Sequence, residues 1–110
     1  MSARLVVAFA VGLITLGMSP SMAAGPTVTV RLFQFRPGQV QVAANSEVIW
    51  ANDDDIKHTV TSGSPERPDA RFDLELAEKG ATRSFRFTQA GVYPYFCNRH
   101  HHMRGEVRVD

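Results

Sequence analysis

The stretch of residues 97–103 lies between two strand-like segments and reads Cys97-Asn98-Arg99-His100-His101-His102-Met103. It brings a thiol, several imidazoles and a thioether into one short loop. Cys97 is the only cysteine of the 110-residue chain, and the fourth histidine, His58, stands alone far upstream between other strand-like segments. All of these side chain types bind metals, so the loop together with His58 is the first candidate for a functional site.

Two imidazoles, one thiolate and a weak axial thioether are the ligands of a blue-copper electron-transfer site. The sequence therefore predicts a copper site formed by His58, Cys97, one histidine of the loop and Met103. In an exported protein, an unpaired cysteine implies either pairing with another molecule or a special thiol, and a metal-bound thiolate is such a thiol. The alternatives are an inert buried Cys97, a satisfied core His58 and a core Met103. The spacing within the loop, and the turn just before His58, favour metal ligands over buried core residues at these positions.

Residues 1–23 have the pattern of a secretory signal peptide. A positively charged start precedes an apolar run over residues 5–16, and small residues ending at Ala23 form a cleavage site. The alternative is a membrane-spanning helix, which needs about 20 apolar residues, whereas Pro20 follows this shorter run. The sequence therefore predicts cleavage near Ala23 and export of one mature domain, residues 24–110, to a periplasm.

Alternating apolar residues dominate the mature domain and predict half-buried strands. The clearest pattern covers residues 27–32, and further alternating pairs are Val40 and Val42, Val48 and Trp50, Phe85 and Phe87, and Val107 and Val109. Turn residues separate these segments and no long helical stripe is present, so we predict an all-β sandwich or barrel. Residues 62–71 show the weakest alternation of apolar residues, so we predict a surface loop there. The formal net charge of +1 offers no basic stripe for a nucleic acid.

Five segments of the mature domain carry a family resemblance. They read Phe33-Gln34-Phe35-Arg36-Pro37, Val48-Ile49-Trp50-Ala51-Asn52-Asp53-Asp54, His58-Thr59-Val60, Ala90-Gly91-Val92-Tyr93-Pro94-Tyr95-Phe96-Cys97 and Met103-Arg104-Gly105-Glu106-Val107. In this order they resemble the cupredoxins, small blue-copper proteins of the plastocyanin, pseudoazurin and amicyanin group. The resemblance implies an all-β Greek-key sandwich of the cupredoxin type that holds one copper ion.

The spacing within the loop resembles the short loop of the amicyanin type. His100 follows Cys97 by three residues, and Met103 follows His100 by three. This family spacing selects His100 as the second imidazole, and the resemblance implies His58, Cys97, His100 and Met103 as the metal ligands. Three consecutive imidazoles in a tight loop cannot all reach one metal, because alternate side chains point to different sides.

Four other positions near the ligands depart from the amicyanin type. Thr59 and Asn98 stand where amicyanin-like proteins carry Asn and Thr, and we expect the same hydrogen bond with exchanged partners; the alternative is that both face solvent. Arg99 and His101 replace prolines, so the loop is less stiff and a positive charge lies near the copper. The acidic run 53–55 either offsets Arg99, forms a docking patch or is simply solvated.

The expected function is electron transfer rather than catalysis. Copper oxidases place a histidine directly beside the copper cysteine, a pattern that is absent around Cys97. The resemblance implies a monomeric periplasmic protein that passes single electrons between redox partner proteins at the edge of His100. An amine dehydrogenase and a c-type cytochrome are the partners that the amicyanin type implies. The alternative is a periplasmic copper carrier or sensor, in which His101 and His102 would be extra ligands; the closed ligand set argues against it.

Overall fold

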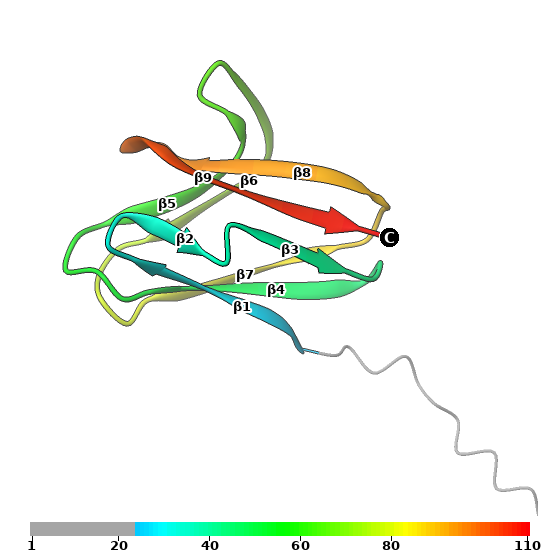
Figure 1. Cartoon of the computed structure of the whole chain (residues 1–110), viewed down its shortest axis with the longest axis horizontal. Coiled ribbons are helices and arrows are strands. Elements are labelled where there is room, and N and C mark those ends of the chain that lie inside the picture. Colours follow the sequence, from blue (N-terminus) through cyan, green and yellow to red (C-terminus); the bar gives the residue numbers. More distant parts are fainter. Residues whose placement is uncertain (1–23) are drawn as a thin grey trace, which may run out of the picture.

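The structure is a computed structural model that describes residues 24–110, so the predicted signal peptide lies outside the described residues. Over that range the chain forms strands without any helix (Figure 1). The strands are β1 (Ala24–Arg31), β2 (Gln34–Arg36), β3 (Gln39–Val42), β4 (Ser46–Asn52), β5 (His58–Ser64), β6 (Arg67–Leu76), β7 (Thr82–Phe87), β8 (Gly91–Cys97) and β9 (His100–Val109). Residues 24–110 accordingly contain no helix that is long and apolar enough to cross a membrane.

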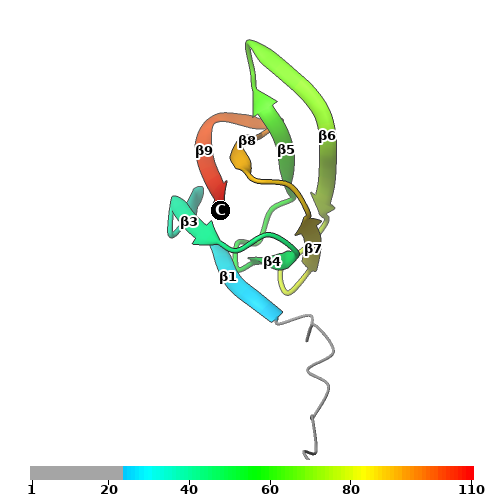
Figure 2. The same ribbon diagram turned by 90° about the vertical axis from the view of Figure 1, so that its right-hand side faces the viewer.

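The strands form two sheets that pack against each other (Figure 2). One sheet has the strand order β2-β1-β4-β7, and the other has the order β3-β9-β8-β5-β6. Most neighbouring strands are antiparallel, but β1 pairs with β4 and β3 pairs with β9 in parallel. This two-sheet, all-β architecture confirms the sandwich that the alternating pattern predicted.

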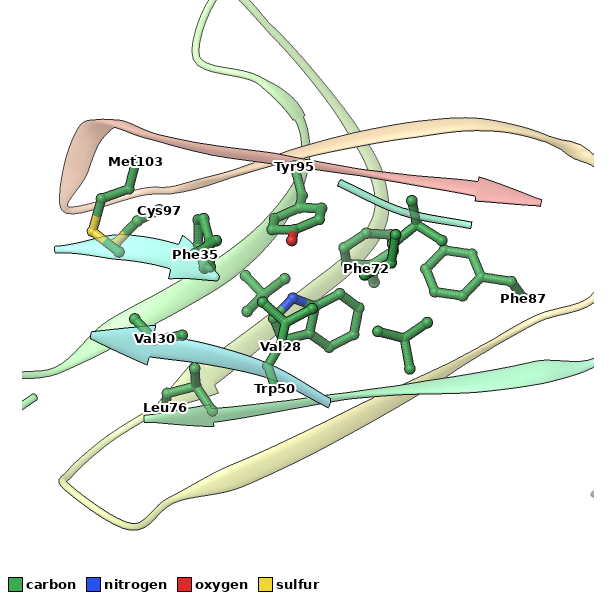
Figure 3. Close-up of a cluster of buried hydrophobic side chains, with 14 of the residues drawn as sticks. Val28, Val30, Phe35, Trp50, Phe72, Leu76, Phe87, Tyr95, Cys97 and Met103 are labelled. Carbon is green, nitrogen blue, oxygen red and sulfur yellow. The ribbon is translucent and has the colours of Figure 1, made fainter. Parts of the chain in front are cut away.

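The core fills the space between the sheets, because every second residue of a strand points to the same side. Trp50 is fully buried, and its ring packs edge-to-face against Tyr95 with the ring centroids 5.4 Å apart (Figure 3). Cys97 and Met103 belong to the same buried cluster. The predicted metal site is therefore built into one end of the core rather than onto a separate loop.

Tyr95 and Gly105 lie opposite each other on β8 and β9. A Cβ atom on Gly105 would stand 2.3 Å from the Tyr95 ring, so only glycine leaves room for the phenol to cross the neighbouring strand. Burial raises the pKa of Tyr95 to about 12. This contact fixes β9 to the core just after Met103.

The alternating pair Phe85 and Phe87 lies in strand β7 as predicted, but residues 62–71, predicted as a loop, belong to the β5–β6 hairpin. The hydroxyl oxygen of Ser62 accepts hydrogen bonds from the N–H groups of Arg71 and Phe72, at 2.8 and 2.9 Å. These bonds satisfy the backbone at an irregularity in the strand pairing. The hairpin is thus closed by a polar side chain, and no apolar alternation marked it in the sequence.

The last strand also differs from its prediction. It begins at His100 instead of after Met103, because Cys97 and His100 pair across a two-residue turn. Most of the predicted ligand loop, residues 97–103, therefore belongs to strands, and the hydrogen bonds of the sheet hold its three histidines in place.

Candidate metal centre

Three of the predicted ligands stand at strand ends that meet at one end of the sandwich. His58 is the first residue of β5, Cys97 is the last residue of β8, and His100 is the first residue of β9. Cys97 and His100 pair across the turn formed by Asn98 and Arg99. Antiparallel pairing of β5 with β8 brings His58 to the same place. Three hydrogen-bonded strands thus hold the three side chains.

The donor atoms of these residues converge. Cys97 Sγ lies 3.8 Å from His58 Nδ1 and 3.7 Å from His100 Nδ1, and the three atoms lie within 4.8 Å of one another. These separations fit a single ion bound at ~2.0 Å to nitrogen and ~2.3 Å to sulfur. His58 and Cys97 are fully buried, whereas His100 is partly exposed. A thiolate with two imidazoles suits copper, so the residues present fit that ion.

Met103 is the predicted axial ligand. Its side chain is 1% exposed and belongs to the same core cluster as Cys97. Figure 3 shows the two sulfur-bearing side chains at the same end of the core. Met103 therefore lies at the end of the core that carries Cys97 (Figure 3), and its binding to a metal stays a prediction.

Asp54 is a buried site residue that the sequence did not single out. Its carboxylate lies 2.8 Å from His58 Nε2. Burial opposes ionisation, but hydrogen bonds from Phe33 N–H, His58 and Leu32 N–H outweigh it and hold the pKa of Asp54 below its ordinary value. Since an ionised carboxylate only accepts, Nε2 of His58 carries a proton, and Nδ1 is the ring nitrogen that faces Cys97. The only sequence signal for this role was the position of Asp54 four residues before His58, and the neighbouring aspartates 53 and 55 gave no reason to choose it.

The same carboxylate fixes the turn between β1 and β2. Leu32 and Phe33 have positive φ angles of 51° and 58°, which are unusual for bulky side chains. Their N–H groups donate to the two oxygens of Asp54 at 2.7 and 3.0 Å. The turn holds the Phe33 ring against both imidazoles, with its centroid 5.4 Å from that of His58 and 5.0 Å from that of His100. Asp54 therefore supports both histidines, one directly and one through Phe33.

The predicted hydrogen bond between Thr59 and Asn98 is present. The N–H of Asn98 donates to Thr59 Oγ1 at 2.8 Å, and the N–H of Thr59 lies 3.4 Å from Cys97 Sγ. The threonine side chain is the acceptor, while the asparagine takes part through its backbone instead of its amide side chain. Both contacts tie Cys97 to the strand that carries His58.

The other two histidines of the run lie outside this cluster. A ring nitrogen of His101 lies 3.1 Å from the carbonyl oxygen of Asn98, and His102 is exposed. Desolvation, followed by the neighbouring histidines and Arg99, lowers the pKa of His100 and favours its neutral, metal-binding form. Arg99 is exposed and acts electrostatically on His100, which agrees with the positive charge predicted near the site.

A two-sheet β-sandwich with cysteine and two histidines converging at one end has the architecture of a cupredoxin. The model of the family "Copper binding proteins, plastocyanin/azurin family" matches residues 23–110, and the chain belongs to this family. The chain is 32% identical to amicyanin-alpha of Methylorubrum extorquens, over 79% of this chain and 74% of that protein. It is 29% identical to the amicyanin of Paracoccus versutus over 76% of this chain, and spans 63% of that relative's length.

Solved structures show the same fold. A purple cupredoxin from Nitrosopumilus maritimus superposes with a TM-score of 0.71 at 21% identity, covering 78% of this chain and 100% of that one. An amicyanin variant in its Cu(I) state superposes with a TM-score of 0.69 at 25% identity. The match covers 78% of this chain and 82% of the amicyanin chain. The comparisons confirm the predicted cupredoxin fold, the likeness to amicyanin and copper as the cofactor.

Proposed function

We propose that this protein is a blue-copper electron carrier whose single copper ion is held by His58, Cys97, His100 and Met103. The convergence of one sulfur and two imidazole nitrogens, with Cys97 Sγ 3.7 and 3.8 Å from the nitrogens, is the observation that supports this most directly. Relatives that the chain matches include amicyanins and a plastocyanin. Thiolate, imidazole and a weak thioether suit a copper electron-transfer site.

Bound copper supplies the one-electron chemistry, and the residues around it decide how easily the electron moves. His58 and Cys97 are buried at strand ends, which excludes water and resists movement of the ligands. Asp54 and Phe33 hold the imidazoles from outside, as hydrogen-bonded outer residues do in metal sites. His100 is partly exposed, so its outer edge is the proposed point of electron entry and exit.

The proposed place of action is a periplasm, where the carrier works as a monomer without enzymatic activity of its own. The signal-peptide pattern of residues 1–23 and the likeness to bacterial amicyanins support this proposal. The proposed partners are other redox proteins. The amicyanin likeness favours an amine dehydrogenase as the electron donor and a c-type cytochrome as the acceptor.

Copper titration of the purified mature protein tests the function. We expect one Cu(II) ion per chain, an intense blue colour from charge transfer between thiolate and copper, and reversible one-electron voltammetry with copper retained against a chelator. Cys97→Ser should abolish the colour. A colourless wild-type protein with Cu(II) bound, or a blue Cys97→Ser variant, would contradict the blue-copper assignment. Rapid loss of copper to the chelator without reversible voltammetry would favour the carrier or sensor instead.

A further inference from the structure

A row of hydrogen-bonded side chains leads across the outer face of the second sheet to the metal centre. Thr61 Oγ1 lies 2.8 Å from Asp73 Oδ1, Thr59 Oγ1 lies 2.9 Å from Thr61 Oγ1, and the N–H of Asn98 donates to Thr59 Oγ1 at 2.8 Å. These three bonds form the Asp73 relay, which runs from the carboxylate of Asp73 to the backbone N–H of Asn98. Its inner end is the residue that follows Cys97.

The direction of each bond in the Asp73 relay follows from its two ends. A carboxylate at neutral pH accepts and does not donate, so the hydroxyl of Thr61 donates to Asp73. The oxygen of Thr61 then accepts the proton of the Thr59 hydroxyl. The oxygen of Thr59 therefore presents its lone pairs to Asn98, whose N–H can only donate. Because only one arrangement of protons satisfies all three bonds, the relay holds the Thr59 hydroxyl in one orientation.

Strand register explains why these side chains meet. Thr59 and Thr61 alternate with buried residues of β5 and so share its outer face. Thr61 pairs with Asp73 across β5 and β6, and Thr59 pairs with Glu75 on the same strands. The carboxylate of Glu75 forms an ion pair with Lys57. The hydroxyl of Thr59 instead bonds along its own strand to Thr61, which connects it to Asp73.

We propose that Thr61 and Asp73 are positioning residues of the copper site, although neither touches a predicted ligand. They hold Thr59, whose N–H points to Cys97 Sγ and whose hydroxyl oxygen accepts from Asn98. When the relay is broken, the hydroxyl of Thr59 is free to rotate and its hold on Asn98 weakens. The thiolate then shifts relative to the two imidazoles. This inference rests on the proposed function, since it concerns the same site.

Matched variants separate the relay from general effects of substitution. Thr61→Val removes the hydroxyl and keeps the branched shape, whereas Thr61→Ser keeps the hydroxyl. Asp73→Ala removes the terminal acceptor of the relay. Glu75→Gln removes a carboxylate charge from the same face of β6 without touching the relay.

Two measurements read out the effect. In the copper-free protein, hydrogen exchange of the Asn98 N–H should be faster in Thr61→Val and Asp73→Ala, by up to about fivefold, the factor expected if the bond to Thr59 were lost altogether. In the copper-loaded protein, the same two variants should shift the visible charge-transfer band. Thr61→Ser and Glu75→Gln should match the wild type in both measurements.

The outcomes distinguish this inference from the proposed function. Unchanged exchange at Asn98 in Thr61→Val and Asp73→Ala would overturn the relay, and faster exchange with an unshifted band would overturn its positioning role. A wild-type protein that stays colourless with copper would contradict the proposed function, while exchange in the copper-free protein would still decide whether the relay holds Asn98. If Thr61→Val also speeds exchange throughout the core, the exchange rate in Asp73→Ala, at an exposed position, decides between the two outcomes.

Discussion

The carboxylate of Asp54 and the imidazole of His58 form a hydrogen bond of 2.8 Å inside the protein. The same carboxylate accepts the N–H groups of Leu32 and Phe33, which have left-handed backbone conformations. One acidic side chain therefore supports a buried imidazole, an unusual turn and the aromatic ring against both imidazoles. Loss of such outer contacts lowers metal affinity by about 10–100-fold in metal sites generally.

Asp54→Ala should destabilise the copper-free protein by about 2 kcal/mol, because His58 Nε2–H and two backbone N–H groups lose their acceptor. The pKa of Asp54 is held below its ordinary value, so its stabilising effect is fully present above the pKa of the unfolded chain. That effect is lost as the pH falls through the lower, folded-state pKa. Denaturant unfolding at neutral and strongly acidic pH measures the change. Asp55→Ala, at an exposed position of the same turn, is the control; a wild-type advantage that is equal at both pH values would contradict an ionised acceptor.

His100→Ala should disrupt the blue site severely, whereas His101→Ala and His102→Ala should keep the visible spectrum of the wild type. The reason is that, of these three neighbouring histidines, only His100 has a ring nitrogen close to Cys97 Sγ, at 3.7 Å. External imidazole should restore the spectrum of His100→Ala, since the ring is partly exposed and leaves an accessible space. Visible absorption of the copper-loaded variants is the measurement. A colourless His101 or His102 variant beside a normal His100 variant would reverse the assignment.

Arg99→Gln should lower the reduction potential, because a nearby cation stabilises the reduced site, which is one unit more negative than the oxidised site. The shift should be larger at low ionic strength, since salt screens an exposed charge. Arg99→Pro should lower the reduction potential as well, and its pyrrolidine ring also makes the turn at residue 99 more rigid. Voltammetry over a range of salt concentrations tests the sign. Arg108→Gln, at the opposite end of β9, should leave the potential unchanged. A potential that rises in Arg99→Gln, or that does not respond to salt, would contradict a stabilising effect of the Arg99 charge on the reduced site.

Tyr95→Phe should make stability less sensitive to alkaline pH. The pKa of the buried phenol is raised to about 12, above its ordinary value. The unfolded chain therefore releases this proton first, and the wild type loses stability as the pH rises from about 10 toward the folded-state pKa. The full loss is roughly 2–3 kcal/mol for a shift of this size. Unfolding free energies at neutral and alkaline pH measure it, and parallel pH profiles for the wild type and Tyr95→Phe would refute the assignment to this side chain.

The fold was predictable because several of its strands alternate buried and more exposed residues, with Val28, Val30 and Trp50 on buried faces. The convergence of Cys97 with His100 was also predictable, since both lie in one short stretch. Asp54 was not, because its role depends on the N–H groups of a turn more than twenty residues earlier in the chain, and no periodicity encodes such a contact.

The Asp73 relay was equally hidden in the sequence. Thr61 and Asp73 meet only through the register of β5 with β6, in a hairpin that no pattern in residues 62–71 indicated. Polar contacts on the outer face of a sheet follow from which residues stand opposite each other, and a sequence pattern of apolar residues says nothing about that register. The proposed ligands and the Thr59–Asn98 contact were thus readable from the sequence, whereas the roles of Asp54, Thr61 and Asp73 required the structure.

Cys97, His100 and Met103 lie within one seven-residue stretch, whereas His58 joins them only through the long-range pairing of β5 with β8. Three of the four proposed ligands therefore remain neighbours even in an unfolded chain, which keeps an affinity of its own for the ion. A ligand stabilises a fold only by the difference between its affinities for the folded and the unfolded chain. Copper would then add to the free energy of folding chiefly through His58, and the unfolded chain could already bind the ion before the two sheets form.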